Sequence, residues 1–254
     1  MPDNRYSLDG RIALVTGGAK RIGRAIVLAL AREGCNVIIH YRSSSDDAEK
    51  LARELRDTGV QTWTIQADFS NPDEYSTLIN RAIDMAGSID ILINSASVFS
   101  PGTLEDIDFD DITSNVEINA WVPFVLMRDF ARRMGKGKIV NILDTRFKDF
   151  DFKHIAYILA KKMLYEFTRM AAVKYAPEMT VNAVAPGVIL PPPGEGEDYV
   201  EKLIPTVLLK KRGWPEDVAD AVVFLLKNDF ITGQTIFVDG GRHLKEFQRG
   251  SNPD

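Results

Sequence analysis

The 254-residue chain contains little of what a disulfide scaffold or a metal site needs. Its only cysteine, Cys35, cannot form a disulfide within the chain, which fits a reducing compartment. Cys35 follows a helical pattern and precedes an apolar segment, so a small buried side chain is favoured over a reactive thiol. The chain has three histidines, and we predict no metal site.

Excess positive charge and long apolar segments are also absent. Thirty-one basic and 36 acidic residues give a formal net charge of −5, which disfavours a general nucleic-acid or anionic-membrane surface. The first ten residues lack the basic and apolar parts of a signal peptide, and no apolar run reaches membrane-spanning length. We therefore expect a cytoplasmic protein whose partner is a small-molecule substrate, with no nucleic acid and no membrane.

Short β-branched segments alternate with longer segments of helical periodicity. Seven segments are predicted as strands: residues 12–16, 36–40, 61–67, 89–94, 137–143, 180–185 and 234–238. Between them apolar residues recur at helical spacing, as at Ile22, Ile26 and Leu30. Strands that alternate with helices predict a parallel sheet covered on both faces. We expect a single doubly wound α/β Rossmann domain over residues 1–254, with ligands at the carboxyl ends of its strands.

A glycine-containing loop joins the first predicted strand to the next helix. It reads Thr16-Gly17-Gly18-Ala19-Lys20-Arg21-Ile22-Gly23. Glycines allow a tight turn and close backbone approach, and a helix N-terminus offers unpaired N–H groups and a positive dipole to a pyrophosphate. The G-x-G-x-x-G spacing is absent, and a plain turn could have this composition. The position of the loop after the first strand favours a dinucleotide site that includes Gly17, Lys20, Arg21 and Ile22.

The end of the second predicted strand indicates which dinucleotide binds. Sites selective for NAD usually place a carboxylate there to hold the ribose 2′-hydroxyl. In this chain the segment is His40-Tyr41-Arg42-Ser43-Ser44-Ser45, without an acidic residue before Asp46. Arg42 and the serine hydroxyls can instead pair with a 2′-phosphate, which predicts NADPH. Further residues expected near its phosphates or adenine are Lys20, Arg21, Arg24, Tyr41, Ser43, Asp68 and Phe69.

Tyr157 and Lys161 occur four residues apart in a stretch of helical character. They would share one helix face, with Cβ atoms roughly 5–6 Å apart. A neighbouring ammonium stabilises a phenolate and lowers the tyrosine pKa from about 10, so Tyr157 can deliver a proton to a substrate that receives hydride. Such pairs are common by chance. The context supports this one, because Asp144 directly follows a predicted strand, at the edge where a crevice is expected.

Over essentially its whole length the chain resembles the short-chain dehydrogenase/reductase family. The matching features are the loop at 16–23, NSAS at 94–97, Asn119, Asp144, Tyr157-x-x-x-Lys161, Pro186-Gly187 and VDGG at 238–241. The resemblance implies a catalytic tetrad of Asn119, Asp144, Tyr157 and Lys161, and a homotetramer. It also implies that the nicotinamide half of the cofactor is flanked by Asn94, Ala96, Tyr157, Lys161, Pro186, Gly187 and Val188.

Three positions depart from the family pattern. Arg21 replaces a loop glycine, residues 94–97 replace NNAG, and Asp144 stands where the family has its catalytic serine. A serine hydroxyl donates to a carbonyl oxygen as that oxygen becomes negative, whereas an ionised aspartate would repel it. Asp144 would instead accept hydrogen bonds from N–H groups or, if protonated, donate one to a ring nitrogen. We therefore expect a nitrogen-rich substrate with a reducible C=N bond.

These departures make the chain similar to the pteridine reductase branch of the family. KHIAYILAK and DGGRHL resemble bacterial dihydromonapterin reductases more closely still. The branch implies that an aromatic residue, here Phe99, sandwiches the pterin against the nicotinamide. The residues expected around the substrate are Ser97, Phe99, Asp144 and Tyr157. The predicted reaction is hydride transfer from NADPH to a dihydropterin, which gives the tetrahydropterin.

Two other functions stay open. The chain could be an NADPH-dependent carbonyl or 3-oxoacyl reductase that merely tolerates Asp144. It could also be an NADPH-binding regulator without turnover, although Asn119, Tyr157 and Lys161 argue against this, because a sensor needs no proton donor. The Pro/Gly-rich segment 191–199 is either a functional loop or an irregular surface excursion.

Overall fold

A single seven-stranded sheet runs through the computed structural model, which describes residues 7–244. All its strands are parallel, in the order β3-β2-β1-β4-β5-β6-β7. They are β1 (Ile12–Val15), β2 (Asn36–Tyr41), β3 (Thr62–Gln66), β4 (Ile91–Asn94), β5 (Gly137–Ile142), β6 (Met179–Pro186) and β7 (Thr235–Val238). The predicted doubly wound parallel sheet is confirmed, and each strand boundary lies within about two residues of its prediction. The expectation for the first ten residues falls largely outside the described range.

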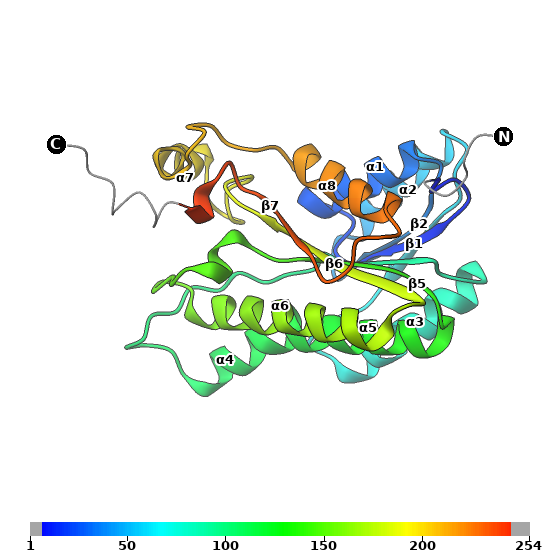
Figure 1. Cartoon of the computed structure of the whole chain (residues 1–254), viewed down its shortest axis with the longest axis horizontal. Coiled ribbons are helices and arrows are strands. Elements are labelled where there is room, and N and C mark those ends of the chain that lie inside the picture. The colour runs from blue at the N-terminus through cyan, green and yellow to red at the C-terminus, as the bar shows by residue number, and fades with distance from the viewer. Residues whose placement is uncertain (1–6, 245–254) are drawn as a thin grey trace.

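Helices cover both faces of the sheet (Figure 1). One face carries α1 (Arg21–Arg32), α2 (Ser45–Arg56) and α8 (Pro215–Lys227). The other carries α3 (Pro72–Ala86), α4 (Phe109–Val116), α5 (Val122–Met134) and α6 (Ile155–Tyr175). A short α7 (Glu197–Leu203) lies after β6, beyond the sheet. None of the helices described in residues 7–244 is long and apolar enough to cross a membrane.

The core consists of two buried apolar clusters, one on each side of the sheet. Strands covered on both faces need no alternation of apolar and polar residues, and β2 accordingly buries four consecutive side chains, Val37 to His40. Cys35 is fully buried in the first cluster, and burial raises the pKa of its thiol to about 12. This agrees with its interpretation as a small core residue.

The strand order changes direction beside β1, which lies between β2 and β4. In open α/β sheets such a switch point leaves a crevice at the carboxyl ends of the strands. The loops after β1, β4, β5 and β6 meet there, and they carry Gly17, Ala96, Asp144 and Gly187. The fold therefore gathers most of the predicted site at one edge of the sheet.

Candidate active site

The loop after β1 folds tightly against the start of α1. Gly17 has a positive φ of 63°, and a Cβ atom there would lie 2.9 Å from the Ala96 Cα. A Cβ atom on Gly23 would lie 2.1 Å from the Gly17 carbonyl oxygen. Glycine is therefore required at both positions, and the backbone leaves the space in front of the helix N-terminus open to a ligand phosphate.

Arg21 begins α1 in the left-handed region, with a φ of 56°. This explains why the family has a glycine at this place, because a residue with a Cβ atom pays for the conformation. The guanidinium group of Arg21 donates to the carbonyl oxygen of Pro191, in the loop after β6. Burial lowers the pKa of Arg21. The side chain thus joins two loops that border the crevice.

His40 lines the candidate site, although the sequence alone did not single it out. Its Nδ1 accepts the Gly17 N–H at 3.0 Å, and its Nε2 lies 3.0 Å from the Ala67 carbonyl oxygen. The ring stacks on Phe69 at 4.5 Å between centroids. Burial lowers the pKa of His40 to about 4, so the ring is neutral and can accept the Gly17 proton. A histidine inside an otherwise apolar strand was the available signal.

A cavity of about 240 Å³ lies beside this loop. Its lining includes residues predicted for the phosphates and the adenosine end of the cofactor: Gly17, Lys20, Tyr41, Arg42, Ser43, Asp68 and Phe69. Ala96, predicted beside the nicotinamide, lines it as well. Lys20 forms an ion pair with Asp47 at 2.9 Å, which offsets part of its charge. Arg24 pairs with Glu54 at 3.0 Å and lines neither this cavity nor its neighbour. Hydrogen bonds from Ser70 lower the pKa of Asp68.

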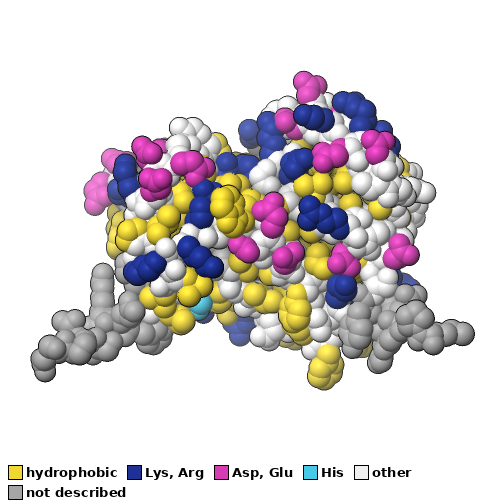
Figure 2. Space-filling view, turned by 90° about the horizontal axis from the view of Figure 1, so that it is seen from above, with side chains coloured by type: hydrophobic (Ala, Val, Ile, Leu, Met, Phe, Trp, Pro, Cys, Tyr) yellow, Lys and Arg dark blue, Asp and Glu magenta, His cyan; other side chains and the backbone are white. Residues whose placement is uncertain are grey.

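A larger cavity of about 560 Å³ continues from the first and shares Gly17, Arg42 and Ala96 with it. It holds residues predicted for the nicotinamide and the substrate: Ser97, Phe99, Asp144, Tyr157, Lys161, Pro186, Gly187 and Val188. Arg21 and Ile22, predicted for the phosphates of the cofactor, line it as well. Seen from above, the surface is hollowed between two raised parts, and Lys and Arg side chains border the hollow (Figure 2).

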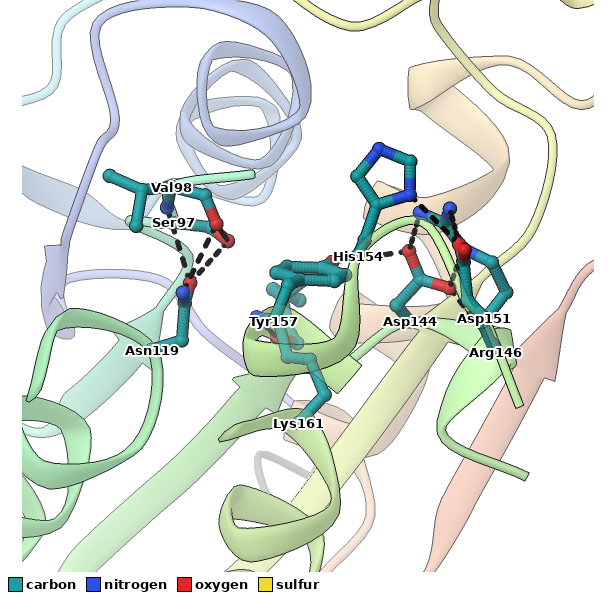
Figure 3. A network of polar contacts seen from close by, with 10 residues as sticks. Ser97, Val98, Asn119, Asp144, Arg146, Asp151, His154, Tyr157 and Lys161 are labelled. Atoms are coloured by element: carbon teal, nitrogen blue, oxygen red, sulfur yellow. Dashed lines mark hydrogen bonds and ion pairs between the residues drawn. The ribbon is translucent and has the colours of Figure 1, made fainter. Parts of the chain in front are cut away.

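Like Arg24, the predicted residues Asn94 and Asn119 lie outside both cavities. The Asn94 side chain turns into the core and donates to the Asn141 Oδ1 at 2.8 Å. Asn119 is fully buried in a π-helical turn, Glu117–Trp121, between α4 and α5. Its Oδ1 accepts the Ser97 hydroxyl at 2.6 Å and its Nδ2 donates to the Val98 carbonyl oxygen at 3.1 Å. Asn119 therefore fixes the turn that borders the cavity, on the opposite side of Tyr157 from Asp144 (Figure 3).

Asp144 begins the short 3₁₀ turn after β5 and is held by Arg146. The carboxylate accepts the Arg146 backbone N–H at 2.8 Å and two guanidinium N–H groups, at 3.1 and 2.8 Å. Burial opposes ionisation, but Arg146 outweighs it and holds the pKa of Asp144 below its usual value. Of the two alternatives for Asp144, the structure favours the ionised acceptor over the protonated donor.

The Tyr157 hydroxyl donates to the Asp144 Oδ2 at 3.1 Å (Figure 3). Burial and the negative charge of Asp144 raise the pKa of Tyr157 well above its ordinary value, although Arg146 partly opposes them. The expectation that Lys161 lowers this pKa is wrong for this structure, because burial and the carboxylate dominate. Tyr157 therefore holds its proton throughout the neutral range.

Lys161 lies one helical turn beyond Tyr157 on α6, as its spacing predicts, and is 2% exposed. Its ammonium donates to the Ile142 carbonyl oxygen at 2.9 Å and lies 5.6 Å from the centre of the Tyr157 ring. Burial lowers the pKa of Lys161 to about 8, against the opposing effect of Asp144. At pH 7 Lys161 is a buried cation at the edge of the cavity.

Phe99 packs inside a charged cluster. Its ring stacks on His154 at 3.9 Å between centroids and meets the Tyr157 ring edge-on at 4.8 Å. The Arg146 guanidinium carbon lies 4.6 Å from its centre. Asp151 completes the cluster, because its Oδ2 lies 2.8 Å from Arg146 and 3.0 Å from the His154 Nδ1. A flat substrate would stack only on the part of the Phe99 ring that these neighbours leave open.

The loop after β6 and the turn after β7 also border the larger cavity. Pro192, Pro193 and Tyr199 line it, which places the Pro/Gly-rich segment beside the site. Arg242, in the turn after β7, lines it as well. Neither Arg242 nor Arg146 was selected from the sequence as a site residue, although Arg242 lies in the DGGRHL stretch, because only the fold brings both to the cavity.

Comparisons with known proteins agree with this geometry. The family model described as enoyl-(acyl carrier protein) reductase matches residues 17–243. The 3-oxoacyl-[acyl-carrier-protein] reductase FabG of Staphylococcus epidermidis is 32% identical over 243 residues, which cover 91% of this chain and 98% of that protein.

Solved structures are similar over almost the whole chain. FolM alternative dihydrofolate reductase 1 from Brucella canis, complexed with NADP, has a TM-score of 0.89 and 32% identity, covering 94% of this chain and 96% of its own. A short chain dehydrogenase from Burkholderia cenocepacia in complex with NADP has a TM-score of 0.86 and 30% identity, covering 92% of this chain and 98% of its own.

Proposed function

The chain belongs to the short-chain dehydrogenase/reductase family and is an NADPH-dependent oxidoreductase, and from this premise we propose that it reduces the C=N bond of a dihydropterin to give the tetrahydropterin. One observation carries the proposal. An ionised carboxylate, Asp144, contacts the hydroxyl of the proposed proton donor, Tyr157, at 3.1 Å.

The charge beside Tyr157 discriminates between classes of substrate. Reduction of a carbonyl builds negative charge on oxygen, which a hydrogen-bond donor stabilises and a carboxylate destabilises. Reduction of a C=N bond needs a proton on nitrogen, and the resulting positive charge is favoured by a nearby carboxylate. Asp144 therefore favours an imine-type substrate over a ketone.

Asp144 acts on the substrate through Tyr157. A carboxylate has about four acceptor positions. Three are used by Arg146 and one by the Tyr157 hydroxyl. We assign Asp144 two roles: it orients the Tyr157 hydroxyl and it supplies negative charge beside the substrate. During the reaction the substrate nitrogen takes the place of Asp144 as the acceptor of the Tyr157 proton.

The residues at the crevice fit NADPH. Gly17 and Gly23 keep the α1 N-terminus accessible to a pyrophosphate, and Arg42 supplies positive charge for a 2′-phosphate. Bound there, NADPH supplies the hydride. Lys161 is assigned the nicotinamide ribose hydroxyls, and Phe99 and Tyr157 form an aromatic wall for the pterin ring.

The relatives support two substrate classes. The FolM structure from Brucella canis is that of an alternative dihydrofolate reductase, and a dihydrofolate contains a dihydropterin ring. The FabG relatives instead reduce 3-oxoacyl groups, which keeps a carbonyl substrate as the second candidate. The carboxylate beside Tyr157 decides our preference for the pterin.

A substrate screen tests the proposal. NADPH oxidation is followed with a dihydropterin, a 3-oxoacyl thioester and a simple ketone, using the native chain and Tyr157→Phe. We expect the highest kcat/KM with the dihydropterin and a loss of roughly 100-fold or more in Tyr157→Phe, which keeps the ring but removes its proton. Preference for the thioester would support the second candidate. Tight NADPH binding without turnover of any substrate would support the regulator.

A further inference from the structure

Arg242 stands out among the charged side chains of the larger cavity. It follows β7, lines the cavity and is half-buried. Within residues 7–244 its guanidinium group makes no hydrogen bond and no ion pair. Burial lowers the pKa of Arg242, and the positive charge of Arg146 lowers it further, whereas Asp144 and Tyr199 act in the opposite direction.

Of the other cations that line this cavity, Arg21 and Lys161 donate to backbone carbonyl oxygens, whereas Arg146 is matched by carboxylates. Arg146 has Asp144 and Asp151, each at 2.8 Å. Arg212 pairs with Glu197 on α7. A partly desolvated guanidinium without a counter-charge is costly, so the charge of Arg242 has no structural use among the described residues.

The turn that carries Arg242 is held rigidly. Asp239 is buried and accepts the N–H groups of Gly241 at 3.0 Å and His243 at 2.8 Å. It also accepts the Thr145 hydroxyl at 2.6 Å, which ties the turn to the segment of Asp144. The backbone on both sides of Arg242 is therefore fixed before a ligand arrives, and a preorganised donor binds an anion with little loss of entropy.

We propose that Arg242 binds an anionic group, a carboxylate or a phosphate ester, on the side chain of the substrate. The identity of the reacting ring rests on the proposed function. The cofactor phosphates do not account for Arg242, because they are assigned to α1 and Arg42, whereas Arg242 lies with Asp144, Arg146 and Tyr199. The guanidinium fork matches a carboxylate or a phosphate with two parallel hydrogen bonds.

Three dihydropterins with one common ring test the proposal. Their side chains are a neutral hydroxyalkyl group, the same group as a phosphate ester, and a benzoylglutamate. The variants are Arg242→Met, which keeps the stem, Arg242→Lys, which keeps the charge, and the control Arg53→Met, an exposed arginine of α2 outside the cavities. We expect Arg242→Met to lower kcat/KM roughly 30-fold or more for the anionic substrates and less than about threefold for the neutral one.

The lysine variant distinguishes a site for a phosphate ester from a site for a carboxylate. The lysine ammonium is a point charge, which keeps more of the attraction to a phosphate ester than to a planar carboxylate. We therefore expect Arg242→Lys to restore kcat/KM more fully for the phosphate substrate than for the carboxylate substrate. Equal losses for neutral and anionic substrates, or no loss at all, would overturn the proposal. In each variant the NADPH affinity should match that of Arg53→Met, and the melting temperature should be no lower than that of Arg53→Met.

A binding measurement separates this proposal from the proposed function. Aminobenzoylglutamate and inorganic phosphate are titrated into the complex of the chain with NADP⁺. If the native chain binds either anion, and Arg242→Met binds it roughly 30-fold or more weakly, the anion site is supported even when no dihydropterin is reduced. Binding that is equal in the native chain and Arg242→Met would overturn the site even if dihydropterin reduction were observed.

Discussion

The acidity of Tyr157 is set by two side chains of opposite charge. Asp144 accepts the Tyr157 hydroxyl and raises its pKa, while Arg146 lies within 5.7 Å of the ring centre and lowers it. Because the two partners are themselves hydrogen-bonded, their effects on Tyr157 depend on each other. A substitution at one of them changes both the charge and the freedom of the other.

Replacement of Asp144 by serine should therefore reverse the preference of the site. Asp144→Ser removes the charge that favours a protonated nitrogen, supplies a neutral donor for a carbonyl oxygen, and leaves Arg146 to lower the pKa of Tyr157. We expect kcat/KM to fall roughly 10- to 100-fold for the dihydropterin and to rise for a ketone. The alkaline limit of activity, which Lys161 sets, should also move to lower pH, because Asp144 no longer raises the pKa of Lys161.

Asp151→Asn is the matched control for Asp144→Ser. Asp151 is the other carboxylate that pairs with Arg146, but it makes no hydrogen bond to Tyr157. Loss of Asp151 should affect both substrate classes alike, because it changes how firmly Arg146 and His154 are held but leaves the charge beside the Tyr157 hydroxyl in place. A parallel loss for both classes in Asp144→Ser would reduce Asp144 to the same structural role and remove the charge argument for a pterin.

Two elements far apart in the sequence are joined behind the site. The turn after β7 and the 3₁₀ turn after β5 meet through Asp239 and Thr145. Asp239 also faces Gly187 at the end of β6, where a Cβ atom would lie 2.6 Å from the Asp239 Cβ. The positions of Asp144 and Arg242 thus depend on one buried carboxylate.

Asp239→Asn should loosen this junction. The amide nitrogen cannot accept, so bonds from Thr145 or His243 are lost and a buried donor is left without a partner. We expect the free energy of unfolding to fall by about 1–3 kcal/mol in denaturant titrations at pH 7. The control Asp229→Asn breaks only the pair with Lys138, in which Asp229 is exposed, and should cost less than about 1 kcal/mol. Similar losses in both variants would contradict a special role for Asp239.

The sequence predicts elements better than it predicts contacts between them. The strands follow from β-branched segments and the helices from apolar periodicity, because these signals are local. The spacing of Tyr157 and Lys161 placed both on one helix for the same reason. Arg242 reaches Asp144 only through the order of the strands, and the π-helical turn at Asn119 has no local signal. The raised pKa of Tyr157 depends on burial, which spacing does not encode.

In the whole molecule, the cation of Lys161 is buried at a cost to stability. Its folded pKa of about 8 lies below its ordinary value of 10.5. Below pH 8 the lysine is protonated in both the folded and the unfolded chain, and the full desolvation cost is present. Between pH 8 and 10.5 the folded chain has released the proton while the unfolded chain still binds it. The free energy of unfolding should therefore rise with pH through this window.

Lys161→Met tests this cost directly. Methionine fills a similar volume without charge, so the variant should be more stable than the native chain at pH 7, by up to a few kcal/mol, with about 1 kcal/mol lost at the Ile142 carbonyl oxygen. Denaturant titrations without NADPH at pH 7 and 10 provide the comparison, and the difference between the two chains should shrink at pH 10. A constant difference, or a less stable variant at pH 7, would contradict the burial cost.

The activity of Lys161→Met should change in the opposite direction, because the ammonium assigned to the cofactor ribose is gone. In the native chain kcat/KM should fall as pH rises through about 8. The same buried charge then serves the activity of the chain and lowers its stability at neutral pH.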